Sequence, residues 1–359
     1  MIRLEARNQT SRTLLFWSPV LAVGITVIAG TIMFAFLGKA PIRAIAIIFL
    51  EPLGDIFSIA EIVVKATPLI LIAVGLSFGF KAGIWNIGAE GQFTIGALSG
   101  GSVALALYQI DGAWVLPLMC LAGAVGGMLW AAIPAFLKTR YNANEILVSL
   151  MLTYVAVLLL SALVHGPLKD PDGMNFPESR IFHDGATLPI LIEGTRAHVG
   201  FVAAIVAVAI SWLVLSRHIF GYQIKVLGQS QRAARFGGFD EKQVTWICLM
   251  ISGGLAGLAG LFEAAGPVGQ LVPALPVGYG FTAIIVAFLG RLNPLGILLG
   301  GFVMALTYIG GESAQIELNL PSAVTGVFQG MLLFFLLGID VLANYKIRMT
   351  QPLSRKLSE

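Results

Sequence analysis

Residues 58–80 read SIAEIVVKATPLILIAVGLSFGF, and this stretch decides what kind of fold the chain adopts. An α-helix needs about 20 mainly apolar residues to cross the hydrocarbon core of a bilayer. Only Glu61 and Lys65 carry charge in the stretch, and they lie one helical turn apart near its start, where they could form an ion pair. The stretch therefore predicts a transmembrane helix.

Similar apolar runs recur along the whole chain. Of the 359 residues, 57% are hydrophobic and 11% are charged, against roughly 25% charged residues in soluble domains. A soluble protein with so little charge would expose large apolar patches to water. We therefore predict an all-α, polytopic membrane helix bundle that forms a single domain over 1–359. The ten expected spans are 14–38, 58–80, 91–109, 114–137, 145–165, 198–216, 243–263, 277–290, 294–310 and 322–341.

The lysines and arginines predict the orientation of these spans. Basic residues accumulate in the cytoplasmic loops of membrane proteins. With the N-terminus in the cytoplasm and ten alternating spans, most of the 22 basic residues lie inside, and the C-terminus is cytoplasmic as well. The loop 166–197 is then extracytoplasmic, and the basic loop 217–242 is cytoplasmic. The basic residues on the outer side are Lys39, Arg43, Lys65, Lys169, Arg180 and Arg196.

Several kinds of chemistry have no motif in this sequence. It contains no phosphate-binding G-x-x-x-x-G-K-[ST] loop, no H-E-x-x-H, no C-x-x-C and no G-x-S-x-G. The centres of the expected spans carry no relay of acidic residues, which proton- or sodium-driven carriers usually have. We therefore expect no enzymatic activity, no metal or cofactor site and no nucleic-acid surface. The net charge of +3 indicates membrane topology.

A glycine-rich interruption follows the second expected span. Residues 81–96 read KAGIWNIGAEGQFTIG and place Asn86, Glu90 and Gln92 between two apolar runs. Irregular backbone survives at membrane depth only where it is buried in protein or lines a wet cavity. Broken helices of this kind often form transport sites. The segment is therefore either part of a translocation path or a tight cytoplasmic turn.

A polar stripe begins the expected span after the loop near residue 142. In 142–154, NANEILVSLMLTY, Asn144 is suited to cap the helix, and an early acid suits its dipole. Glu145, Ser149 and Thr153 follow at intervals of four residues, so they share one helix face. These side chains either line a path or hold neighbouring helices together by hydrogen bonds.

The inside loop contains a short basic helix. In 221–242, GYQIKVLGQSQRAARFGGFDEK, Ser230 can cap a helix that ends at Gly237 and Gly238. Such a helix, narrow at its two alanines, could fit a cleft in a cytoplasmic partner, or could rest on anionic lipid headgroups. Its candidate contact residues are Arg232, Ala233, Ala234 and Arg235.

A second interruption and an internal echo lie near the C-terminus. In 276–301, PVGYGFTAIIVAFLGRLNPLGILLGG, a short span ends near Gly290 and a new helix starts at Pro294. Residues 96–108, GALSGGSVALALY, resemble 296–308, GILLGGFVMALTY. Transporters often contain internal repeats, but in a glycine-rich apolar chain a short match can also arise by chance.

These segments together resemble a known family. The chain is similar to permease subunits of ABC importers in the branched-chain amino acid, ribose and nucleoside group, most of all to the nucleoside branch, whose receptors are lipoproteins of the basic membrane protein type. The segments that carry the resemblance are GIWNIGAEGQFTIGAL (83–98), NANEILVSLMLTY (142–154), LGQSQRAARFGGFDEKQV (227–244) and GYGFTAIIVAFLGRLNPLGILLGG (278–301).

The resemblance implies a multi-subunit importer in a bacterial plasma (inner) membrane. The permease would pair with a second permease, expected to differ from it, two cytoplasmic ATP-binding cassette subunits and an extracytoplasmic solute receptor. The basic loop would dock into the ATPase, with Gly228, Arg235 and Gly238 matching the family pattern, although Gln229 and Gln231 stand where the family often has Asn. The implied solute is a nucleoside, with a simple sugar or a branched-chain amino acid as alternatives. A stand-alone carrier or channel is the less favoured reading.

Overall fold

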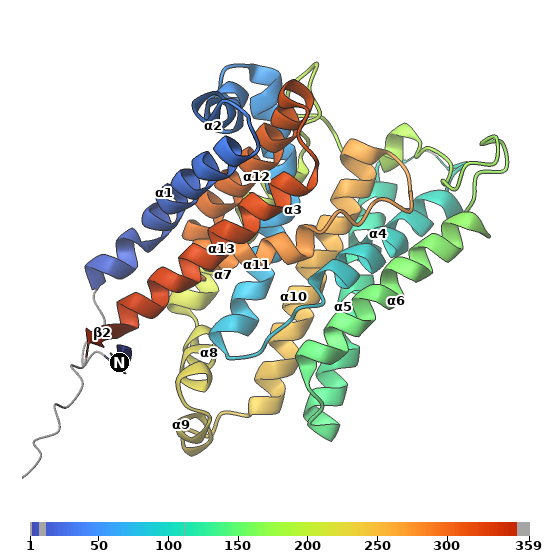
Figure 1. The fold of residues 1–359 in the computed structure, drawn as a ribbon. Helices are drawn as coiled ribbons and strands as arrows, with labels where there is room; N and C mark the ends of the chain where they lie inside the picture. The colour runs from blue at the N-terminus through green and yellow to red at the C-terminus, as the bar shows by residue number, and fades with distance from the viewer. Residues whose placement is uncertain (1, 7–11, 111, 350–359) are drawn as a thin grey trace, which may run out of the picture. The chain divides into compact units, whose positions relative to one another are not determined.

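The computed structural model describes residues 2–6, 12–110 and 112–349, and nearly all of their regular structure is helical (Figure 1). Short helical turns η1 (Glu51–Leu53), η2 (Asp184–Ala186) and η3 (Ala264–Val268) add to the α-helices. The α-helices are α1 (Arg12–Phe36), α2 (Pro41–Phe49), α3 (Ile56–Lys81), α4 (Ala89–Ala106), α5 (Val115–Tyr141), α6 (Glu145–His165), α7 (Gly200–Arg217), α8 (Ile219–Gln229), α9 (Gln231–Phe236), α10 (Glu241–Glu263), α11 (Tyr279–Leu289), α12 (Pro294–Leu318) and α13 (Ala323–Asn344).

The prediction of a helical membrane bundle is confirmed at the level of the fold class. Seven helices in the described part of the chain are long and apolar enough to cross a membrane, namely α1, α3, α5, α6, α7, α10 with η3, and α12. The other three expected spans correspond to α4, α11 and α13. The count of ten spans stays a prediction. The cytoplasmic location of both ends also stays a prediction. Residues 1, 7–11 and 350–359 lie outside the described part.

Two helices and two strands have no counterpart in the sequence prediction. Helices α2 and α8 are amphipathic rather than uniformly apolar, so a search for long apolar runs passes over them. Strands β1 (Ile2–Ala6) and β2 (Tyr345–Met349) pair antiparallel near the two ends of the chain. This pairing joins segments more than 300 residues apart, and no local pattern in the sequence signals it.

The chain divides into two compact units, 1–47 with 311–359 and 48–310. In the first unit, α1 packs against α13. Gly30 allows this approach, because a Cβ atom there would lie 2.5 Å from the ring of Phe328. That the whole chain, 1–359, acts as a single permease domain stays a prediction.

The second unit is built around two buried helices. In α3, 83% of the most apolar window is buried, and in α10 with η3 67%, against 22% in each of α5, α6 and α7. Gly75 and Phe78 of α3 lie against Ser252 and Cys248 of α10, so the two helices run antiparallel. The exposed sides of α5, α6 and α7 are apolar, as expected of helices that face lipid.

Glycines allow α4, α5 and α10 to approach one another at backbone distance. A Cβ atom on Gly96 would lie 2.1 Å from the Cα of Gly257, and one on Gly127 would lie 2.1 Å from the carbonyl oxygen of Gly253. Gly123 and Gly127 of α5, and Gly253 and Gly257 of α10, form two small-xxx-small motifs of the kind that packs membrane helices. The abundance of glycine in this chain thus has a packing role at this crossing.

Two buried helices of the second unit are each followed by irregular backbone and a shorter helix. After α3, residues 82–88 lead into α4, and after α10 and η3, residues 269–278 lead into α11 (Figure 1). The interruption expected after Gly290 is confirmed, because α11 ends at Leu289, a tight turn follows, and α12 starts at Pro294. That turn needs left-handed backbone at Arg291 and Leu292, whereas the long irregular segment lies before α11.

Candidate functional site

The first turns of α4 and α11 meet at Glu90. The carboxylate of Glu90 accepts hydrogen bonds from the backbone N–H groups of Gly278, at 2.7 Å, and Gly280, at 2.5 Å. These donors belong to the unpaired N-terminal groups of α11, where the helix dipole favours a negative charge. Gly280 is required for this approach, because a Cβ atom there would lie 2.2 Å from the backbone nitrogen of Glu90. A buried carboxylate thus fastens the two interrupted helices together.

A fully buried amide cluster fixes the irregular segment to α4 and α10. The side-chain nitrogen of Asn86 donates to Gln92 Oε1 at 2.8 Å and to Ser252 Oγ at 2.9 Å. Gln92 Nε2 and the backbone N–H of Gly88 both donate to Asn86 Oδ1, at 3.2 and 3.1 Å. Asn86, Gln92 and Ser252 are each 1% exposed. The cluster satisfies its own polar groups, as buried amides require.

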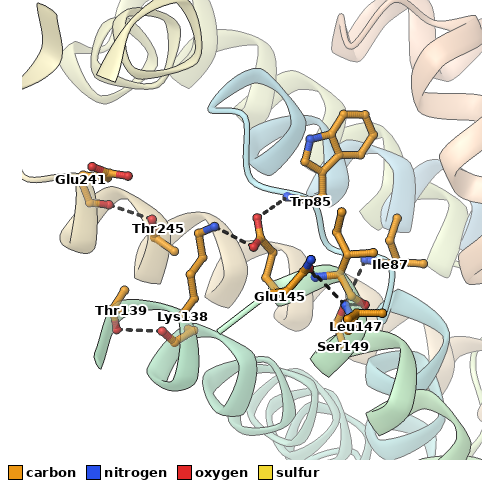
Figure 2. A network of polar contacts seen from close by, with 12 residues as sticks. Trp85, Ile87, Lys138, Thr139, Glu145, Leu147, Ser149, Glu241 and Thr245 are labelled. Carbon is orange, nitrogen blue, oxygen red and sulfur yellow. Dashed lines mark hydrogen bonds and ion pairs between the residues drawn. The ribbon is translucent and has the colours of Figure 1, made fainter. Parts of the chain in front are cut away.

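The polar stripe of α6 supports the same irregular segment (Figure 2). Ser149 Oγ accepts from the backbone N–H of Ile87 at 3.3 Å, and Glu145 Oε1 accepts a long, 3.5 Å contact from that of Trp85. Thr153 Oγ1 donates back to the carbonyl oxygen of Ser149. The stripe thus supplies hydrogen-bond partners to backbone that forms no helix, which meets the requirement for irregular backbone inside a membrane protein.

Glu145 also connects the stripe to the end of α5. Its Oε2 lies 2.7 Å from Lys138 Nζ, and the side chains of the pair are only 24% and 11% exposed for Lys138 and Glu145 (Figure 2). Glu145 therefore connects a residue near the molecular surface to the backbone of Trp85. Sequence reasoning selected Glu145 but missed Lys138. The signal was available, because Lys138 ends an apolar run seven residues before an acid.

Six of the seven expected path residues come together, and Asn144 does not. Asn86, Glu90, Gln92, Glu145, Ser149 and Thr153 are between 1% and 8% exposed. Asn144 is exposed and caps α6 by accepting from the N–H groups of Ile146 and Leu147. In this conformation the six side chains hold backbone in place. Their part in a solute path stays a prediction.

The expected ion pair of Glu61 with Lys65 is replaced by two longer-range contacts. Arg196 binds the carboxylate of Glu61 in a bidentate manner, with N–O distances of 2.8 and 2.5 Å. Lys65 Nζ instead donates to the hydroxyl of Tyr279 at 3.0 Å, and that hydroxyl donates to Glu263 Oε1 at 3.2 Å. Tertiary packing thus gives each residue a partner more than 100 positions away.

The loop 166–197 packs on the second irregular segment. The backbone N–H of Phe182 donates to the carbonyl oxygen of Gly269 at 2.8 Å, and Ser179 exchanges two hydrogen bonds with Leu271. The loop therefore covers the entry to α11 at the end of this unit that lies opposite α9 (Figure 1). The expectation that this loop is extracytoplasmic stays a prediction.

Helix α9 has the expected boundaries and cap. Ser230 Oγ accepts from the N–H of Ala233 at 3.3 Å, and Gly238 has left-handed backbone with φ 77° after the helix ends. Arg232, Ala233 and Arg235 are exposed, but Ala234 is fully buried within the chain. Of the two alanines, only Ala233 therefore presents its methyl group outward.

Gly228 and Phe236 lie at the same end of the unit, one buried against α3 and the other exposed. Gly228 closes α8 onto α3, because a Cβ atom there would lie 1.9 Å from the carbonyl oxygen of Lys81. Its place in the family pattern therefore has a packing reason. Phe236, the last residue of α9, is 94% exposed and was missed in the sequence. Because aromatic residues are enriched at interface hot spots, Phe236 is a candidate contact residue.

The fold defines a polytopic helical membrane protein, and the sequence contains none of the four catalytic or nucleotide-binding motifs named above. The chain belongs to the family described as branched-chain amino acid transport system / permease component, which matches residues 58–337. It is an ABC transporter permease subunit, so ATP hydrolysis belongs to a partner chain.

Curated relatives cover nearly the whole chain. A glucose ABC transporter permease protein of Haloferax volcanii is 35% identical over 96% of this chain and 93% of its own length. A guanosine ABC transporter permease protein of Bacillus subtilis is 29% identical over 92% and 94%. A nucleoside ABC transporter permease protein of Lactococcus lactis is 25% identical over 92% of each.

Solved structures show a more distant likeness. A chain from an ABC transporter of the metal-chelate type, in an inward-facing conformation, matches with a TM-score of 0.47 and 16% identity over 91% of this chain and 99% of its own. PsaBC from Streptococcus pneumoniae matches with a TM-score of 0.42 and 13% identity over 81% and 91%.

Proposed function

We propose that the chain forms half of the translocation path of an importer for a solute that carries a sugar ring, with nucleosides first. The relatives are named for glucose, guanosine and nucleosides, and a polyhydroxylated ring is common to all three. A free simple sugar is the first alternative, and a branched-chain amino acid, after which the family is named, the second. The receptor subunit would make the choice among these, and the permease would admit what the receptor delivers.

The observation that carries the proposal is the junction at Glu90. Two shortened helices meet there end to end, held by one carboxylate and two backbone N–H groups. Such a junction can separate and close again without unfolding either helix, because few hydrogen bonds cross it. We assign to it the role of a gate, with Asn86, Gln92, Ser149 and Thr153 positioning its irregular wall.

The proposed partners follow from the ends of the second unit. Helices α8 and α9, with Gly228, Arg232, Ala233, Arg235 and Gly238, would face the cytoplasm and dock on an ATP-binding cassette subunit. A second, different permease would complete the path, as the two guanosine permease proteins of Bacillus subtilis suggest by their shared name. The loop 166–197 would face an extracytoplasmic receptor, a lipoprotein or a periplasmic protein. The membrane would be the bacterial plasma membrane.

Co-purification tests the docking role of α9. Since Ala234 is buried, replacing it would disturb the permease itself, and the informative change is Ala233→Glu. We expect the ATPase subunit to co-purify with the wild type and to be lost with Ala233→Glu. Arg217→Glu, on an exposed residue at the end of α7, is the matched control and should retain the ATPase. Equal recovery of the ATPase with both variants would contradict the proposed orientation of α9.

The receptor tests the solute class independently of docking. Reconstituted with its partners, the transporter should accumulate radiolabelled guanosine or adenosine when the receptor and ATP are both present. Uptake of leucine in preference to nucleosides and hexoses would overturn the proposed solute class and leave the docking of α9 intact.

A further inference from the structure

A basic groove lies between the end of α5, helix α9 and the start of α10. Its cavity measures about 360 Å³. Its lining residues come from three separate stretches of chain, namely Lys138, Thr139, Arg140, Asn142, Gln231, Arg235, Glu241, Lys242 and Thr245. Four of these side chains are cationic and one is acidic, so the groove carries a net positive charge.

Only part of this positive charge is balanced from within the chain. Arg235 pairs with Glu241 at 3.0 Å, and Lys138 pairs with Glu145 at 2.7 Å. Among the residues that the structure describes, neither Arg140 nor Lys242 lies within 4.0 Å of an acidic group, and both are exposed. Two cations in one concave surface therefore have the capacity to bind an anionic group.

We propose that this groove is a socket for an acidic side chain of the ATPase subunit, with Arg140 and Lys242 as its ligands. The inference rests on the proposed docking of α9 and adds a second wall to that interface. Two lining residues, Gln231 and Arg235, belong to α9 itself, so the groove is continuous with the docking surface.

The surroundings of the groove fit a protein partner. Phe236 directly follows Arg235 and is 94% exposed. An apolar anchor next to a charge-complementary rim is the usual arrangement of protein interfaces. A lipid headgroup would use the same charges, so binding to anionic lipid is one of the outcomes that the experiment below distinguishes.

The groove also connects to the interior of the permease. Lys138 lines it and at the same time pairs with Glu145, which contacts the backbone N–H of Trp85 in the irregular segment (Figure 2). An acid that enters the groove competes with Glu145 for Lys138. The effect of docking is therefore transmitted through the side chains of Lys138 and Glu145 to the irregular segment next to the Glu90 junction.

The experiment compares two matched double variants in detergent without anionic lipid. Arg140→Gln with Lys242→Gln removes the two unbalanced cations of the groove. Arg43→Gln with Arg217→Gln removes two exposed cations that lie outside the groove and outside helices α8 and α9. We expect the groove variant to weaken ATPase binding about ten-fold, with less dependence on salt, and the control to stay within about two-fold. Wild-type affinity of the groove variant would overturn the proposal.

Thiol protection provides a second readout that does not depend on affinity. In a chain with Cys120→Ala and Cys248→Ala, a reagent should label Arg140→Cys freely in the permease alone and poorly when the ATPase is bound. Unchanged labelling would overturn the socket. Loss of ATPase binding that occurs only with phosphatidylglycerol vesicles present would assign the groove to lipid and also overturn it. If Ala233→Glu abolishes docking while both groove readouts stay at wild type, the socket fails and the proposed function stands.

Discussion

Oε2 of Glu90 accepts a 2.5 Å hydrogen bond from the backbone N–H of Gly280, a residue 190 positions later in the chain. This contact, with its neighbour at Gly278, joins the two interrupted helices of the permease. Because it pairs one carboxylate with the N-terminal groups of a helix, its strength depends on charge as well as on geometry.

Removal of the Glu90 carboxylate should therefore loosen the junction. Each hydrogen bond to a charged group contributes about 1.5–3 kcal/mol, and buried donors left without partners cost more. We expect Glu90→Ala to lower the thermal unfolding midpoint strongly, and Glu90→Gln, which keeps one acceptor, to lower it less. Fluorescence-detected thermal unfolding in detergent measures both. Glu193→Gln, on an exposed loop residue, should leave the midpoint unchanged. Equal midpoints for Glu90→Ala and wild type would contradict the assignment.

The glycine crossing of α4, α5 and α10 should not tolerate a methyl group. A Cβ atom on Gly257 would lie 2.3 Å from the carbonyl oxygen of Gly123, so Gly257→Ala must push the helices apart. Overpacking of this kind costs about 1–3 kcal/mol. We expect a lower unfolding midpoint and aggregation on gel filtration. Gly24→Ala, with open space around the site, is the control and should behave like wild type.

The Lys138–Glu145 pair should transmit ATPase docking inward. Lys138→Gln removes the link between groove and irregular segment but leaves Arg140 and Lys242 in place. We expect the ATPase to bind, while stimulation of ATP hydrolysis by loaded receptor falls several-fold. Lys138→Arg keeps a cation within reach of Glu145 and leaves the contact of Glu145 with the Trp85 N–H intact, so it should retain much of the stimulation. Full stimulation in the Lys138→Gln variant would show that the pair serves only the local fold.

Acid should destabilise the segment before α7 through His198. Burial lowers the pKa of this imidazole to about 4, and its Nδ1 accepts from the N–H of Gly200 at 3.2 Å. The unfolded chain has the ordinary histidine pKa of about 6.5. The unfolded state thus binds the proton first, and stability present above pH 6.5 is lost as the pH falls toward 4, by about 1.4 kcal/mol per unit.

The matching variant is His198→Asn, whose amide oxygen can accept the same hydrogen bond without titrating. Unfolding midpoints measured between pH 7.5 and 4.5 should fall for the wild type and change less for His198→Asn. His165→Asn, on an exposed histidine, should follow the wild-type curve. Parallel curves for the wild type and His198→Asn would rule out this linkage.

Phe236 should matter for association and not for folding. Its ring is 94% exposed, so Phe236→Ala removes few contacts within the permease. Aromatic anchors at interfaces contribute 2 kcal/mol or more when truncated, which is about thirty-fold in affinity. We expect the variant to have a wild-type unfolding midpoint but markedly weaker ATPase binding. Binding of the ATPase to permease immobilised on a sensor surface measures the affinity. Wild-type affinity would remove Phe236 from the docking surface.

All ten expected spans correspond to helices in the structure. A long apolar run can be recognised from consecutive residues alone. Lipid contact and helix length are properties of consecutive residues, so the runs at 58–80 and 145–165 could be read directly. The cap at Ser230 and the polar stripe of Glu145, Ser149 and Thr153 follow the same logic, since both depend on spacing within a few turns.

Pairings between distant residues could not be read this way. Glu61 was expected to pair with Lys65 but binds Arg196, and Glu90 was known to be polar but not to reach Gly280. Ala234 was expected to contact a partner yet lies buried in its own chain. In each case the partner is chosen by how helices cross, which spacing along one helix does not specify.

The sequence by itself determined that this chain is embedded in a membrane, as a helical permease with interrupted segments rich in glycine. Only the tertiary structure decided that two of those segments meet end to end at one carboxylate, and that Lys138 stands between a surface groove and that interior. The physical reason is that hydrophobic length and capping act over a few turns. A buried charge finds its partner through the whole folded chain, wherever low exposure makes an unpaired group too costly.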